Sequence, residues 1–203
     1  MWSIIQAAGW PIWPLIFASI IALALILERL WSLRQKVVAP PGMVDKVLDE
    51  YKHNGVTSEL LTRVAHQGPL GRVLASGLAN VKSPRPVMKE AIEEVGHIVA
   101  HDLERFLTTL GTIAAMSPLL GLFGTVVGMI EIFGSQSPTG GTNPGQLAHG
   151  ISIALYNTAF GIAISIPSLI FYRHFKNKVD GFVVRMEQAA SKMVDIVHGE
   201  RPQ

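Results

Sequence analysis

Three long stretches of this sequence carry no Asp, Glu, Lys or Arg, and this feature constrains the fold more than any other. They are residues 1–27, 106–130 and 132–172. A helix needs about 20 residues to cross roughly 30 Å of hydrocarbon, so an uncharged apolar stretch of about 18 or more residues predicts a membrane span. Only 16% of the 203 residues are charged. The chain is therefore predicted to be an integral membrane protein.

The third stretch is too long for one span. It has 41 residues, and the turn formers Gly, Ser, Pro, Thr and Asn dominate residues 134–145. Such a run cannot stay helical in lipid, so it predicts a short loop, residues 134–148, between two spans. The three expected spans are residues 11–30, 108–132 and 149–172.

The placement of Lys and Arg predicts the orientation, because basic residues near spans are retained in the cytoplasm. Residues 33–107 hold ten of the seventeen Lys and Arg, the tail from Arg173 holds six, and the loop 134–148 holds none. We therefore expect four regions: a periplasmic N-terminal end with the first span (1–32), a cytoplasmic helical loop (33–107), spans two and three with a periplasmic loop (108–172), and a cytoplasmic C-terminal helix (173–203).

Helical spacing of apolar residues continues beyond the spans, which predicts an all-α chain with long cytoplasmic extensions of spans two and three. The third span should continue as one helix to His198, about 75 Å from residue 149 at 1.5 Å per residue. Pro86 suits a helix start, and Val87, Ala91, Val95 and Ile98 lead into the second span without a breaker. Two or three shorter helices are expected between Pro40 and Pro84.

Apolar stripes on helices outside the membrane need partners. Packing against further copies of the chain would bury them, which makes a homo-oligomer the economical interpretation. The alternative is a bundle within the chain, formed with the helices expected in residues 41–84.

The second span carries small residues on one face. Gly121, Gly124 and Gly128 are three and four residues apart, a spacing that lets two membrane helices approach closely. Pro118 and Pro167 each remove a helix hydrogen bond in mid-span, which usually kinks a helix. Those kinks are either packing geometry or points of flexing.

A small polar set lies within spans two and three. Thr125 and Thr158 are 15 to 18 residues from the loop centre near Gly140, so in antiparallel spans they should lie at similar depth. Their hydroxyls either face a polar path, where they would bind water or a partner's carboxyl group, or donate to their own helix carbonyls. Asn157, Ser152 and Ser165 are weaker members of the set.

Glu131 is the only acidic residue between Glu104 and Asp180. An ionisable group inside a span is costly, so Glu131 is a functional candidate, although its carboxylate could simply reach the outer headgroups.

Other chemistry is not indicated. His97 and His101 have a metal-binding spacing, but no third ligand is evident, and a solvated helix face is the simpler interpretation. No catalytic or nucleotide-binding motif occurs, so neither an enzyme nor a cofactor is expected. A net charge of +2 does not argue for nucleic acid.

Two blocks of the sequence resemble the conserved blocks of the ExbB/TolQ branch of the MotA/TolQ/ExbB proton channel family. They are residues 114–129 (AAMSPLLGLFGTVVGM) and 150–168 (GISIALYNTAFGIAISIPS). The resemblance implies a ring, a homopentamer, in the bacterial inner membrane, whose pore is lined by spans two and three. It also implies an ExbD- or TolR-like single-span partner with a proton-carrying aspartate, and a TonB- or TolA-like protein that receives the motion. Thr125 and Thr158 match the pore threonines.

One position departs from the family pattern. ExbB and TolQ usually place a glutamate where this chain has Ile153. We hypothesise that Glu131, expected at similar depth, replaces it. Three functions remain open: an ExbB-like transport subunit, a TolQ-like subunit for outer-membrane maintenance, and a non-conducting scaffold for partner helices. A small-solute permease is disfavoured because no inverted repeat is present.

Overall fold

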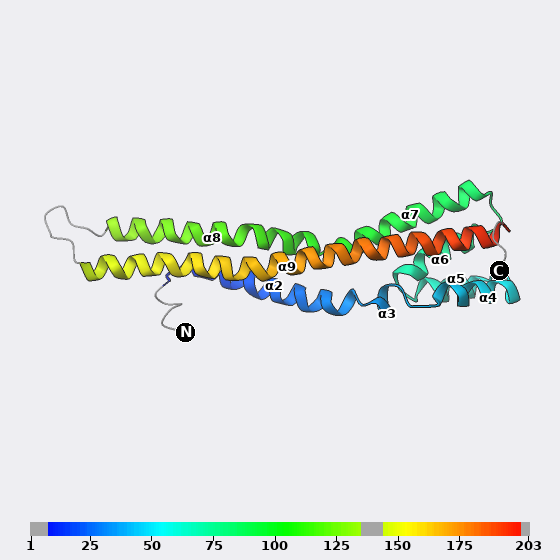
Figure 1. Ribbon diagram of the computed structural model, residues 1–203, viewed down its shortest axis with the longest axis horizontal. Coiled ribbons are helices and arrows are strands. Elements are labelled where there is room, and N and C mark those ends of the chain that lie inside the picture. The colour runs from blue at the N-terminus through cyan, green and yellow to red at the C-terminus, as the bar shows by residue number, and fades with distance from the viewer. Residues whose placement is uncertain (1–7, 135–143, 200–203) are drawn as a thin grey trace. The chain divides into compact units, whose positions relative to one another are not determined.

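A computed structural model describes residues 8–134 and 144–199, without the side chains of Gln146, His149 and Ile153. In this part of the chain every regular element is a helix (Figure 1), which confirms the all-α prediction. The helices are α2 (Ile12–Ser32), α3 (Gln35–Val38), α4 (Met43–Asn54), α5 (Ser58–Ala65), α6 (Pro69–Ala79), α7 (Arg85–Glu104), α8 (Leu107–Gly134) and α9 (Pro144–Val197).

Three helical segments are long and apolar enough to cross a membrane, as the uncharged stretches predict. They lie in Ile12–Ser32, Arg85–Gly134 and Gly150–Val197. The third continues without interruption to Val197, close to the predicted end. Its helix begins earlier than predicted, at Pro144, because proline is well suited to the first helical position, where no backbone N–H is needed. The predicted loop 134–148 was therefore too long at both ends, and its centre, 135–143, lies outside the described residues.

The predicted uninterrupted entry into span two was wrong by two residues. Helix α7 ends at Glu104 and α8 begins at Leu107. The guanidinium of Arg29, only 5% exposed, donates from Nη1 to the Leu103 carbonyl at 3.2 Å. A side chain that takes a carbonyl in this way supplies one of the partners that the end of a helix lacks.

The chain divides into two compact units. The first takes the chain up to Glu28 together with Phe106–His174, and the second takes Arg29–Arg105 together with the chain from Phe175 onward.

In the first unit α8 and the first part of α9 pack side by side in antiparallel directions (Figure 1). Contacts along the pair run from Gly111 against the Tyr172 ring to Gly150 against Ile132. The start of the described chain joins them, because Ala8, Ile12 and Leu15 are buried at 1%, 0% and 0% exposure.

In the second unit three helices lie between Pro40 and Pro84, where two or three were predicted, and they pack with α7 and the end of α9. The Met193 side chain lies against Gly77 of α6, where Ile92 of α7 also makes contact. The end of α9 is held to α4 and α7 by ion pairs, Lys192 to Asp45 at 2.6 Å and Arg85 to Asp195 at 2.8 Å. The apolar stripe of α9 (Val179, Phe182, Met186, Met193) is thus buried within one chain, as the alternative of an intrachain bundle proposed.

Helix α7 buries a different face from the predicted one. Its core residues are Met88, Ile92, Val99 and Leu103, whereas Val87 and Ile98 remain 46% and 48% exposed. Both sets have helical spacing, and neighbouring residues point about 100° apart on a helix, so periodicity alone could not choose between them.

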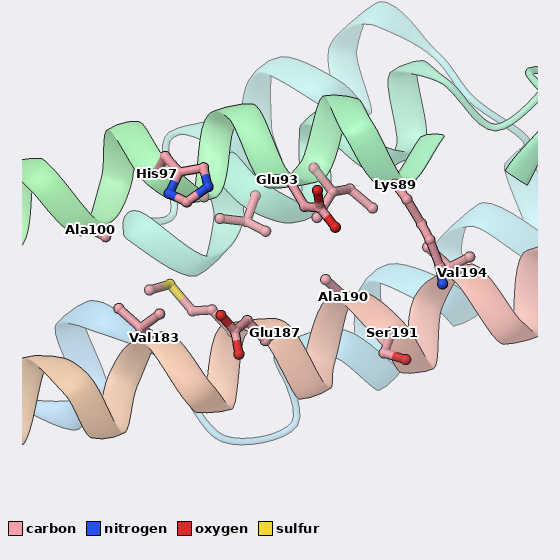
Figure 2. A pocket seen from close by; sticks show the side chains of 13 residues that line it. Lys89, Glu93, His97, Ala100, Val183, Glu187, Ala190, Ser191 and Val194 are labelled. Atoms are coloured by element: carbon pink, nitrogen blue, oxygen red, sulfur yellow. The ribbon is translucent and has the colours of Figure 1, made fainter. Parts of the chain in front are cut away.

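Helices α7 and α9 face each other across a cleft in the second unit (Figure 2). Its volume is about 260 Å³. Val73, Ile92 and Met186 belong to its apolar lining. Its charged and polar lining residues are Lys89, Glu93, His97, Glu187 and Ser191.

Candidate functional site

The contact between α8 and α9 depends on glycine. A Cβ added to Gly121 would lie 2.8 Å from the Asn157 carbonyl oxygen and 3.0 Å from the Thr158 Cα, and one added to Gly124 would lie 2.6 Å from the Asn157 Cβ. On the facing helix, a Cβ at Gly161 would lie 2.5 Å from the Ser117 carbonyl oxygen. The two backbones therefore touch, which is the packing expected where lipid gives helices no hydrophobic reason to associate.

This close approach brings Thr125 and Thr158 together. Their Oγ1 atoms are 3.2 Å apart, and both side chains are half-buried. The similar depth inferred from their distances to the loop is thus a direct contact between hydroxyls.

Backbone carbonyls take part in the same group. Thr125 Oγ1 donates to the Leu122 carbonyl at 2.7 Å and lies 3.3 Å from the Gly121 carbonyl oxygen, while Thr158 Oγ1 lies 3.2 Å from that same Gly121 oxygen. Each hydroxyl has one proton but two lone pairs. With the protons directed to carbonyls, the pair still has acceptor capacity for a hydrogen bond from outside the chain.

Asn157, predicted beside this pair as a pore-lining residue, has a different environment. Its side chain is 0% exposed, packs on Gly124, and donates from Nδ2 to the Ala8 carbonyl at 2.9 Å. Next to this contact, Trp10 meets the Phe123 ring edge to face, with centroids 6.0 Å apart. In this chain Asn157 thus ties the segment before α2 to α9.

Glu131 and Ile153 lie at similar levels of the helix pair. Gly128 lies against Ala154, and Gly150 lies against Ile132, so the backbones of residues 131 and 153 lie between these two contacts. The Glu131 side chain is exposed, and the Ile153 side chain lies outside the described part of the chain.

Sequence reasoning gave too little weight to Ser165. Its Oγ donates across to the Ala114 carbonyl of α8 at 2.6 Å. The sequence itself indicates that the Ala114 carbonyl needs another donor, because Pro118 lies four residues after Ala114 and cannot donate to that carbonyl. Ser152, by contrast, donates within its own helix to the Ala148 carbonyl at 2.9 Å.

A metal centre does not emerge elsewhere in residues 8–134 and 144–199. Among these residues no group of three or more His, Asp or Glu is arranged to hold a metal ion. His97 lines the cleft between α7 and α9, near Glu93 on the same helix and across from Glu187 (Figure 2). The group of hydroxyls and carbonyls between α8 and α9 is therefore the candidate site.

The candidate site lies in a part of the chain that is similar to known proteins. The sequence pattern of the MotA/TolQ/ExbB proton channel family matches residues 65–188, which include α8 and most of α9. The chain is 32% identical to biopolymer transport protein exbB1 of Vibrio cholerae over 171 residues, 81% of this chain and 74% of that protein. It is 31% identical to biopolymer transport protein ExbB-like 3 of Synechocystis over 174 residues, 85% of this chain and 83% of that protein.

Proposed function

The chain belongs to the MotA/TolQ/ExbB proton channel family, and on that premise we propose that it is an ExbB-like subunit of an inner-membrane proton channel. The channel couples the proton motive force to TonB-dependent transport across the outer membrane. In this proposal five copies form a ring, the N-terminal end and the loop after α8 are periplasmic, and residues 33–107 and 173–203 are cytoplasmic. The excess of Lys and Arg in the latter two segments supports this orientation.

The contact between Thr125 and Thr158 is the observation that carries the proposal. Two half-buried hydroxyls 3.2 Å apart, on two span helices with apolar surfaces, form a polar position in a region where polar groups are costly. A hydroxyl does not titrate near neutral pH, so these residues would hydrogen-bond a proton carrier instead of carrying the proton themselves.

The proton carrier would be an aspartate of an ExbD- or TolR-like single-span partner. Beside Thr125 a shallow apolar groove along α8 offers a surface for such a helix, lined by Val126, Met129, Ile130 and Phe133. When the threonine protons are directed to carbonyls, the pair can accept a hydrogen bond from the protonated carboxylic acid. Once the acid is ionised, a threonine proton would have to turn from a carbonyl to the carboxylate.

A non-conducting scaffold is the second candidate, and one observation favours it. Both hydroxyls already lie within hydrogen-bonding distance of backbone carbonyls of α8, so they need no partner to be satisfied. A TolQ-like subunit, coupled through a TolA-like protein to outer-membrane maintenance, would use the same site. The identity of the protein that co-purifies with the complex distinguishes TonB-type from TolA-type coupling.

Valine substitutions test the conducting role. Thr125→Val and Thr158→Val keep the branched shape but remove the hydroxyl. We expect each to lower proton flux into vesicles containing the purified native complex at least about ten-fold, the equivalent of one hydrogen bond to a charged group. Native mass spectrometry must show an unchanged complex. The matched control is Thr112→Val, because Thr112 is exposed on the same helix and donates to its own Thr108 carbonyl at 2.9 Å. Unchanged flux in both variants would support the scaffold.

The same assay tests the proposed replacement of the family glutamate by Glu131. If the Glu131 carboxylate acts at the level of residue 153, Glu131→Gln reduces proton flux and Glu131→Asp retains most of it. Equal flux and equal assembly in native and Glu131→Gln complexes would show that Glu131 only faces the outer headgroups.

A further inference from the structure

Pro118 leaves a gap in the backbone hydrogen bonds of α8. Proline has no N–H, so the Ala114 carbonyl, four residues earlier, loses its donor within the helix. In a hydrocarbon environment water cannot take its place, so the carbonyl needs a donor from protein.

Ser165 supplies this donor from the neighbouring helix, through the 2.6 Å hydrogen bond from its Oγ to the Ala114 oxygen. A serine in a membrane helix can also donate to a carbonyl of its own helix. The other serines described in α8 and in the spanning part of α9 do so: Ser117 to Ile113, Ser152 to Ala148, and Ser168 to Ile164.

The second proline lacks an equivalent. Pro167 frees the Ala163 carbonyl in the same way, but within the described residues no side chain donates to that oxygen. Ser168, the next residue, donates to the Ile164 carbonyl at 2.7 Å. The two prolines therefore differ, because only the one in α8 is tied to the facing helix.

Two hydroxyl groups of α9 thus reach carbonyls of α8, on either side of the closest backbone contact. Ser165 reaches Ala114, Thr158 lies 3.2 Å from the Gly121 oxygen, and Gly161 touches the Ser117 carbonyl between them. A sliding or rotation of α9 along α8 would break both bonds together.

We propose that Ser165 is a positioning residue: its hydroxyl replaces the donor missing at Pro118 and fixes the register in which the Thr125 and Thr158 hydroxyls meet. The helix α8 is then held to α9 beside Pro118, and this proline does not act as a hinge. The importance of this register for proton transfer rests on the proposed function, whereas the attachment of α8 to α9 itself does not.

Disulfide formation measures the register directly. The chain has no cysteine, so Thr125→Cys with Thr158→Cys gives one defined pair, at positions whose hydroxyls are 3.2 Å apart. We expect fast oxidation of this pair in the purified full-length chain. Adding Ser165→Ala should slow the oxidation about three-fold or more. A change of this size corresponds to the measured free energies of hydrogen bonds between membrane helices. Ser165→Thr, which keeps a hydroxyl, should restore most of the rate, and Ser168→Ala is the matched control without effect.

Repeating the measurement in a chain that also carries Pro118→Ala distinguishes the proposed role of Ser165 from a general weakening of the contact between α8 and α9. Pro118→Ala returns an N–H to the Ala114 carbonyl, so Ser165→Ala should then change the oxidation rate far less. The proposal is overturned if Ser165→Ala oxidises at the native rate, or if it slows oxidation equally with and without Pro118. Failure of Ser165→Thr to restore the rate would also count against it. None of these outcomes depends on whether the complex conducts protons.

Discussion

In the first unit α8 meets α9 through glycines, backbone atoms and hydroxyls. In the second unit the end of α9 meets α6 and α7 through large apolar side chains, and α4 and α7 through ion pairs. Both contacts use the same helix, α9. Lipid is as apolar as leucine, so helices in it associate by close packing and hydrogen bonding. In water, burial of apolar surface drives the contact. This change in chemistry along α9 is what the proposed passage of the helix from lipid into water would require.

Met193→Ala should have the largest effect if apolar burial stabilises the second unit. Met193 is 0% exposed and lies against Gly77. Removal of a fully buried methionine typically costs about 2–5 kcal/mol. Hydrogen exchange of the α6 amides in the purified full chain measures it. Met116→Ala, at a site 50% exposed on α8, is the control and should stay within about 0.5 kcal/mol. Equal effects of the two variants would show that burial of apolar side chains does not distinguish the contact in the second unit from the contact in the first.

Gly124→Ala should be next. The added Cβ would overlap the Asn157 side chain, 2.6 Å away, and overpacking of this kind costs about 1–3 kcal/mol. Unfolding of the purified chain by titration with a denaturing detergent measures the loss. Gly134→Ala on the same helix, where nothing lies within 4 Å of the new atom, is the matched control. If both alanines are tolerated alike, the close packing of Gly124 on Asn157 does not stabilise the contact between α8 and α9.

Gly96→Ala should have the smallest effect, in the opposite direction. Gly96 lines the cleft of the second unit, and an added Cβ would meet nothing within 4 Å. Alanine is favoured over glycine inside a helix by up to about 1 kcal/mol, so α7 should become more stable. Slower exchange of the α7 amides would show it. A loss of stability would mean that the cleft beside Gly96 is closed in solution.

Uncharged length and helical spacing were enough to predict three spans, the continuity of α9 and the short helices before α7. They also placed Thr125 and Thr158 at one depth, because both positions could be counted from the same loop. The buried face of α7 could not be predicted, since Met88 and Val87 both begin apolar series with helical spacing. Only packing against α6 decides which series is buried.

The partners of polar groups were the other limit. Asn157 donates to the Ala8 carbonyl, 149 residues away in sequence, and no local pattern indicates such a pair. Ser165 was within reach of prediction, because a proline in a span always frees the carbonyl four residues earlier. The break between α7 and α8 lies beside a hydrogen bond from the guanidinium of Arg29, 74 residues before its acceptor, and neither glycine nor proline marks it.

The contact of Gly121 with Gly161 also determines which mutations the chain can accept. Their Cα atoms lie so close that a Cβ on either one would fall within 3.3 Å of the other. Glycine has the smallest side chain, and every single-base change that replaces a glycine codon with another residue adds at least a Cβ. A substitution at Gly121 therefore cannot be compensated by a smaller residue at Gly161. Any larger residue at this crossing must therefore be accommodated by a shift of the backbones of α8 and α9.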